Sequence, residues 1–150
     1  MISKAFLSNK VEWAFRIVVA VIILQTLRFK FLGAEESVLL FTQVSEFVFG
    51  TGKHEALLRI GTGVLELVAG VLLLVPRTAF FGAFLTAGTM AGAVKTHLFI
   101  IGISFNGDGG VLFGVGVLAL LGSVAVMLNR IPTTPVVSKA FEKFLKTEKA

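Results

Sequence analysis

Four long apolar stretches dominate the 150-residue chain. They cover approximately residues 11–31, 56–75, 79–101 and 111–128, more than half of the sequence. A helix needs roughly 20 apolar residues to cross about 30 Å of hydrocarbon, and each stretch meets that requirement. The pattern therefore predicts an all-α membrane protein in which a four-transmembrane-helix bundle forms a single integral membrane domain over residues 1–150.

Two shorter segments are amphipathic. Residues 33–55 place apolar side chains at helical spacing between two glutamates and the breaker Gly50-Thr51-Gly52, which predicts a short helix at the outer interface or a packed extracellular lid. Residues 136–149 place apolar side chains on one helical face and lysines around the rest. We expect this C-terminal amphipathic helix to lie on an anionic cytoplasmic leaflet, with a partner-binding helix as the alternative.

The connections predict how the spans are arranged. Pro76 and Arg77 lie in a link so short that the second and third spans must form an antiparallel hairpin. A glycine-rich turn precedes the fourth span, and its Asp108 either caps that helix or serves a binding site. Gly88-x-x-x-Gly92 and Gly110-x-x-x-Gly114 predict close helix packing.

Composition strengthens the membrane assignment and excludes some chemistry. The chain is 55% hydrophobic and 15% charged, with a mean hydropathy of +0.91, which is too apolar for a soluble domain. No small-residue cleavage site follows the first span, so we expect that span to be retained. The absence of cysteine excludes a disulfide framework, thiol chemistry carried out by this chain and thiolate-ligated metal centres.

The lysines and arginines that flank the spans predict the orientation. One side has only Lys30 and Lys53, whereas the other has Lys4, Lys10, Arg77, Arg130, Lys139, Lys143, Lys146 and Lys149. Because positive flanks stay inside, we expect a multi-pass protein of the cell membrane with cytoplasmic N and C termini. The net charge of +5 reflects this bias, so the expected partners are membrane lipids and no nucleic acid.

Ionisable residues inside the spans each require a partner, a cavity or a route to the interface. The residues in question are Arg16, Arg28, Arg59, Glu66, Lys95 and His97, with Gln25 as a neutral neighbour. Arg16 is close enough to the cytoplasmic side to extend to lipid phosphates. Glu66 is on the order of 15 Å deep, counting 1.5 Å per residue from the start of its span, so it lies near the middle of the membrane.

Helical geometry assigns these residues to faces. Glu66 shares a face with Arg59 and with Gly63 and Gly70, so we expect that face to point into the bundle. Lys95 follows Gly88 and Gly92 on one face and is also expected to point inward. His97 lies about 200° around the helix from Lys95, and we expect it to meet Asp108 or the outer loop.

These assignments predict a polar cavity that opens outward above Glu66. Gln25 and Arg28 share a face. Three cations, Arg28, Arg59 and Lys95, outnumber the one carboxylate of Glu66. This imbalance favours a bound anion or electron-rich oxygen such as a carboxylate, a quinone carbonyl or a lipid head group. The expected ligand-binding residues are Glu66, Lys95, Arg59, Arg28, Gln25, His97 and Asp108. The alternative is a Glu66–Lys95 or Glu66–Arg59 pair that only fixes helix register.

The second span, RIGTGVLELVAGVLLLVP, and the third, GAFLTAGTMAGAVKTHL, together with the outer loop after the first span, resemble the DoxX family of small four-helix membrane proteins. The resemblance covers most of residues 11–128. It implies a subunit of a quinone-coupled redox or detoxification complex, with Glu66 as the carried-over position and Lys95 and His97 matched less securely. Some redox-associated relatives carry cysteines that this chain lacks.

Three functions remain open from the sequence. The first is a DoxX-like membrane subunit that binds a quinone or a small anionic or lipidic ligand, works with other membrane or redox protein subunits and has no intrinsic cofactor or metal. The second is a membrane scaffold or assembly factor without a ligand site. The third is a small transporter, although the second span continues below Glu66 as LVAGVLLLVP without a polar residue. Whether the chain is an enzyme or a homo-oligomer stays open.

Overall fold

The computed structural model describes residues 5–147, and within that range the chain is helical and contains no strand. The helices are α1 (Asn9–Gln25), α2 (Leu27–Leu32), α3 (Glu35–Phe49), α4 (Glu55–Leu74), α5 (Ala79–Thr96), α6 (Val111–Arg130) and α7 (Pro135–Thr147). Short turns of 3₁₀ helix (Gly52–His54 and Ile131–Thr133) and a π-helical turn (His97–Ile101) connect them. The all-α prediction is confirmed.

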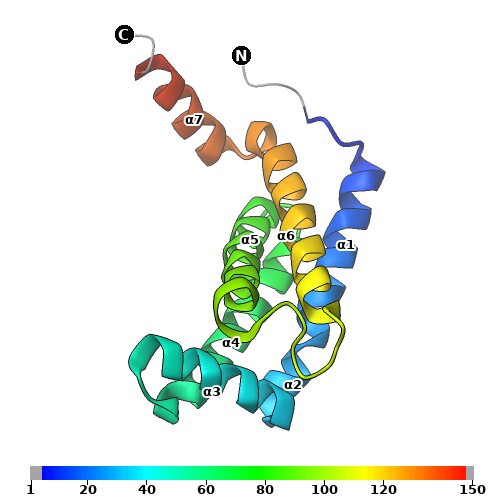
Figure 1. Cartoon of the computed structure of the whole chain (residues 1–150). Coiled ribbons are helices and arrows are strands. Elements are labelled where there is room, and N and C mark those ends of the chain that lie inside the picture. The colour runs from blue at the N-terminus through cyan, green and yellow to red at the C-terminus, as the bar shows by residue number, and fades with distance from the viewer. Residues whose placement is uncertain (1–4, 148–150) are drawn as a thin grey trace.

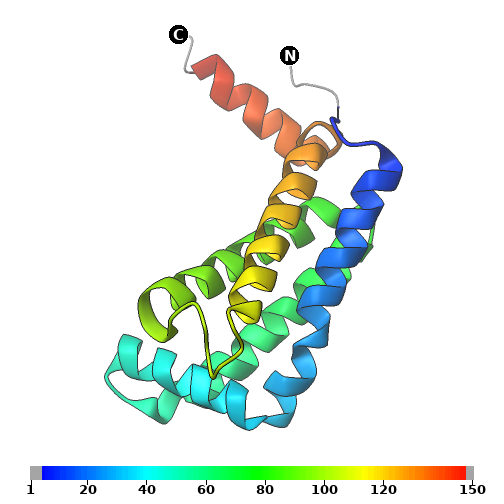
Figure 2. The same ribbon diagram turned by 45° about the vertical axis from the view of Figure 1, so that its right-hand side comes forward.

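Helices α1, α4, α5 and α6 form the bundle (Figure 1). Each of them packs against two others, in the order α1, α4, α5, α6 and back to α1. The turn around Pro76 joins α4 to α5 as the predicted antiparallel hairpin, in which the amide of Thr78 donates to the Val75 carbonyl. Two ends result. The end with the start of α1, the turn at Pro76 and α7 is called the terminal end, and the opposite end is called the α3 end (Figure 2).

Three helical segments are long and apolar enough to cross a membrane. They are Gly52–Leu74, Ala79–Ile101 and Val111–Thr133. Asn9–Leu32 meets the same test only together with Glu35–Phe49, from which it is bent by 87°. The described residues therefore contain three such helices, or four if this bent pair is one span, and the predicted count of four transmembrane helices remains a proposal.

Helix α3 is the helix expected between the first and second spans. It lies across the α3 end of the bundle, against α4 and the π-helical turn (Figure 1). The sharp bend that precedes it occurs at Gly33, whose φ of +66° is in the left-handed region that glycine adopts without a Cβ penalty. The prediction of a helix in this segment is confirmed, and its place at a membrane interface stays a prediction.

Small residues set the distance between the helices. At Gly82 of α5, an added Cβ would lie 2.2 Å from the backbone nitrogen of Leu73 in α4, so the two backbones touch there. By contrast, Gly88, Gly92 and Gly114 have nothing within 4 Å of an added Cβ. The expectation that Gly88-x-x-x-Gly92 and Gly110-x-x-x-Gly114 pack helices together is therefore wrong within this chain.

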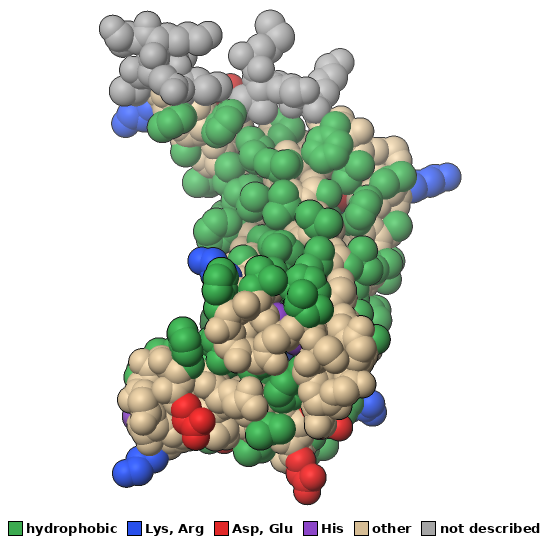
Figure 3. Space-filling view, viewed as in Figure 1, with side chains coloured by type: hydrophobic (Ala, Val, Ile, Leu, Met, Phe, Trp, Pro, Cys, Tyr) green, Lys and Arg blue, Asp and Glu red, His purple; other side chains and the backbone are tan. Residues whose placement is uncertain are grey.

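The C-terminal amphipathic helix is also observed. Helix α7 packs mainly against the turn Ile131–Thr133 and extends away from the bundle (Figure 1). Lys4 and Lys149, which belong to the predicted basic side, lie outside the described residues. On the face shown in Figure 3, apolar side chains cover most of the bundle, while charged side chains lie mainly over α3 and at the margins.

Candidate functional site

Glu66 lies inside the bundle, as expected, but its partner is Lys30 of α2. The Lys30 ammonium donates to Glu66 Oε2 at 2.8 Å, and the Thr26 hydroxyl is 3.0 Å from the same oxygen. The Glu66 side chain is 4% exposed and that of Lys30 12%. The ion pair therefore joins α4 to the break between α1 and α2, in surroundings where a carboxylate without a partner would be costly.

Arg59 also contacts Lys30, through the backbone carbonyl of that residue. Its guanidinium donates to the Lys30 carbonyl, at the end of α2, and to the Glu55 carboxylate one turn earlier on α4. Carbonyls in the last turn of a helix have no intrahelical partner. A cation placed there satisfies one of them and is attracted by the negative end of the helix dipole. Arg59 is thus a clamp between α2 and α4, and the register pairs Glu66–Lys95 and Glu66–Arg59 are both wrong.

The prediction that Lys95 points inward is wrong as well. Lys95 is exposed and makes no hydrogen bond or ion pair with the described residues, whereas His97 is buried with 4% exposure. The inward face of α5 consists of Ala79, Gly82, Ala83, Thr86 and Met90. The glycines Gly88 and Gly92 lie on a different, exposed face, so they misled the assignment of Lys95.

Gln25 and Arg28 also lie outside the bundle. Both are exposed, and the Arg28 guanidinium stacks on the ring of the adjacent Phe29 at 4.5 Å from its centroid. Of the seven predicted ligand-binding residues, the structure brings Glu66 and Arg59 together, through Lys30. The expected cluster of Arg28, Arg59 and Lys95 around one carboxylate does not form.

His97 and Asp108 lie near each other at the start of α6. His97 Nδ1 is 2.9 Å from the Gly102 carbonyl, which confirms the expected contact with the outer loop, and its ring packs edge-on against Phe113. Asp108 accepts from the amides of Phe105, Gly110 and Leu112 at 2.8–2.9 Å. The capping role predicted for Asp108 is confirmed.

The hydrogen bonds to Asp108 predict how the stability of α6 depends on pH. The amides of Leu112 and then Gly110 hold the pKa of Asp108 below its ordinary value of 3.8. The lowered pKa means that the contribution of Asp108 is fully present above pH 3.8 and is lost as the pH falls through the folded-state pKa. We expect Asp108→Asn, which replaces one accepting oxygen by an NH₂ group, to speed hydrogen exchange of the Leu112 amide at neutral pH. The difference from wild type should shrink below pH 3.8; an unchanged difference would contradict the capping role.

A second buried cluster, which the sequence analysis missed, lies at the terminal end. Glu12 is 4% exposed and accepts from Arg130 Nε at 2.6 Å and from the Asn129 amide at 2.5 Å. Asn129 in turn accepts from the Leu7 backbone amide at 2.8 Å. The cluster ties the start of α1 to the end of α6, residues more than 115 positions apart in the sequence.

Arg16 belongs to this cluster and does not extend to the lipid phosphates, so that prediction is wrong. It is completely buried, and its guanidinium donates to the carbonyls of Leu73 and Leu74 at 2.7 and 2.8 Å. These are the last carbonyls of α4, which have no partner within the helix. Arg16 therefore satisfies the end of α4 and remains beside Glu12, at 3.6 Å.

An apolar layer separates the two polar clusters. Its buried side chains come from all four bundle helices and include Val19, Ile23, Ala69, Ala83 and Val126. The buried hydroxyls in this part of the bundle, Thr86 and Ser123, donate to carbonyls of their own helices. The bundle consequently has a charged layer on each side of an apolar centre.

The sequence carried a signal for the missed partners. Glu12 and Arg16 are four residues apart, a spacing that places them on one helical face. The same face continues through Val19, Ile23 and Thr26 to Lys30, at offsets of three and four. Following this stripe would have placed Lys30 opposite the inward face of α4, although it could not have shown that Arg130 and Asn129 return to Glu12.

The fold and these clusters define a helical protein with several helices suited to crossing a membrane and with its inward charges in two structural networks. No protein-family model, no curated protein and no solved structure matches the chain. In the described part of the chain, no three His, Cys, Asp or Glu side chains come close enough to hold a metal ion.

Proposed function

We propose that the protein is an integral membrane scaffold subunit, with four membrane-crossing segments and cytoplasmic termini, that acts by holding a partner helix. The observation that supports this role is the pairing of its buried charges. Glu12 and Glu66 bind cations of other helices, and Arg16 and Arg59 bind carbonyls at helix ends. Each of these groups therefore has a partner within the fold, and Arg16 and Arg130 share the Glu12 carboxylate.

The surface that we assign to the partner is the exposed glycine face of α5, formed by Phe84, Gly88, Gly92 and Lys95. Its two glycines have open space around them, and Phe84 is 59% exposed. Helices in a membrane associate through small residues that let backbones approach closely. Lys95 at the end of the face would match a carboxylate on the partner. The resemblance to the DoxX family supports an accessory role of this kind within a redox-linked complex.

Site-specific crosslinking in native membranes tests this role. A photoreactive phenylalanine analogue at Phe84 is expected to give an adduct of discrete mass, whereas the same group at Val21, which is 58% exposed on α1, should give none. Gly88→Leu with Gly92→Leu should abolish the adduct without unfolding the chain, because both sites are open. Equal adducts at Phe84 and Val21, or none at either, would contradict the scaffold role.

A quinone- or anion-binding function is the second candidate. It is favoured by Lys95 and Arg28, which are exposed cations without a carboxylate partner among the described residues. Saturable binding of a short-chain quinone to the purified protein, lost in Lys95→Met, would favour this candidate. We expect no saturable binding. Transport is disfavoured by the apolar layer between the two charged clusters.

A further inference from the structure

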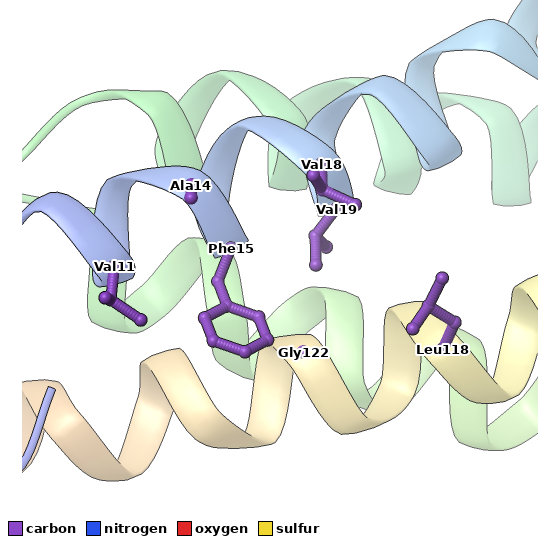
Figure 4. A pocket seen from close by; sticks show the side chains of 7 residues that line it. All are labelled: Val11, Ala14, Phe15, Val18, Val19, Leu118 and Gly122. Atoms are coloured by element: carbon purple, nitrogen blue, oxygen red, sulfur yellow. The ribbon is translucent and has the colours of Figure 1, made fainter.

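An open groove runs between α1 and α6 on the outside of the bundle, about 230 Å³ in volume (Figure 4). Val11, Ala14, Phe15 and Val18 line it from α1, and Leu118 and Gly122 from α6. Among the described residues no charged side chain lines the groove, and Phe15, Val18 and Leu118 are 36–54% exposed. In a membrane, lipid tails would surround this groove.

The length and position of the groove favour one acyl chain over a second protein helix. From Val11 to Val18 it follows eight residues of α1, about 10 Å of helix. It starts near the terminal end and stops in the middle of the bundle, since Leu118 is eight residues into the 20-residue helix α6. One leaflet is about 15 Å thick, so the groove matches a lipid tail of one leaflet and is too short for a crossing helix.

The charges at the open end of the groove favour an anionic head group. Lys10 is adjacent to Val11, and Arg77 and Lys139 also lie exposed at the terminal end. The carboxylates described there are Glu12, which is taken by Arg130 and Asn129, and Glu142 on α7, the helix that also carries Lys139. The cations therefore exceed the acids, and Lys10 makes no hydrogen bond or ion pair with the described residues.

We infer that the groove between α1 and α6 binds one acyl chain of an anionic phospholipid from the leaflet at the terminal end, with Lys10 at its phosphate. This site goes beyond the proposed scaffold role and shares with it only the placement in a membrane. Helices α1 and α6 approach each other closely at the bottom of the groove. At Gly122 an added Cβ would lie 2.7 Å from Val19, so Val19 forms the floor of the groove.

Photolabelling in vesicles tests the site. The protein is reconstituted in phosphatidylcholine vesicles with a trace of either phosphatidylglycerol or phosphatidylcholine that carries a diazirine in one acyl chain. We expect the phosphatidylglycerol probe to label peptides containing Val11–Val18 or Leu118–Gly122 more strongly than the phosphatidylcholine probe does. Lys10→Gln should reduce that preference about fivefold, the value expected for one lysine near an anionic surface, and Lys53→Gln at the α3 end should not.

A groove-filling variant supplies the second comparison. Ala14 is exposed, so Ala14→Phe fills the groove without entering the core, and Val21→Phe is the matched control on the same helix. Ala14→Phe should lower phosphatidylglycerol labelling of the groove peptides to the phosphatidylcholine level, whereas Val21→Phe should leave it unchanged. Circular dichroism and elution as a single species establish that both variants fold.

Three results would overturn the lipid site. Equal labelling by the two probes, unaffected by Ala14→Phe, would show unselective contact with bulk lipid. Because the chain has no cysteine, Ala14→Cys can be oxidised alone, and an efficient disulfide between two copies would assign the groove to a second copy. Release of the protein from vesicles by alkaline carbonate would remove the membrane placement, and the scaffold proposal would then fail too. Retention without selectivity removes only the lipid site.

Discussion

Glu12→Ala is expected to lower the free energy of unfolding by about 3–5 kcal/mol, the range found when one partner of a buried ion pair is removed. The carboxylate lies between Arg130 and Arg16, and the Arg16 side chain is completely buried. Without Glu12, two guanidinium groups would face each other at the terminal end with no anion between them. Equilibrium unfolding of the purified protein in mixed micelles, with a denaturing detergent as titrant, measures the loss.

The matched control is Glu46→Ala, which removes an exposed carboxylate from α3. Substitutions of this kind usually change stability by no more than about 0.5 kcal/mol. A loss at Glu12 that is no larger than the loss at Glu46 would contradict a structural network at the terminal end. Arg16 would then have to be neutralised in another way, for example by a bound anion.

Gly82→Ala is expected to destabilise the bundle by about 3 kcal/mol, at the upper end of the range for overpacked sites. The added methyl group would lie 2.2 Å from the Leu73 nitrogen, and a backbone cannot rotate away as a side chain can. Helices α4 and α5 would have to separate along their whole contact. The unfolding titration used for Glu12 measures the effect.

Gly88→Ala is the control for the same change on the same helix. Nothing lies within 4 Å of an added Cβ at Gly88. Since alanine is favoured over glycine inside a helix by about 0.5–1 kcal/mol, this variant should be neutral or more stable than wild type. If Gly82→Ala and Gly88→Ala behaved alike, the close contact between α4 and α5 would not exist in the folded protein.

The ion pair between Glu66 and Lys30 shows which part of the site can be predicted from the sequence and which part cannot. The sequence identifies Glu66 as an inward residue because a carboxylate in the middle of an apolar run has no route to water, and the structure places it inside. It does not identify the partner, because lysine has a long, flexible side chain. Lys30 lies near the end of a span, which indicates a flanking residue, yet its ammonium reaches Glu66 on another helix.

The glycines show a different limit. On α4 the glycine pattern pointed to the buried face correctly, because Gly63 and Gly70 share it with Glu66. On α5 the same rule failed, because that helix has small residues on two faces and only the one with Gly82 contacts α4. A small residue permits close packing without requiring it, so the sequence could not choose between the faces.

The sequence by itself determined the class of fold, since runs of apolar residues, their breaks at glycine and proline, and the amphipathic tail depend on local chemistry and length. It also identified Glu66 as a charge that would be costly to bury without a partner. Only the tertiary structure decided how each charge is compensated. Glu12 with Arg130, Glu66 with Lys30, and Arg16 with the end of α4 are contacts between residues 36 to 118 positions apart. Such contacts depend on how the helices cross, which no local pattern specifies.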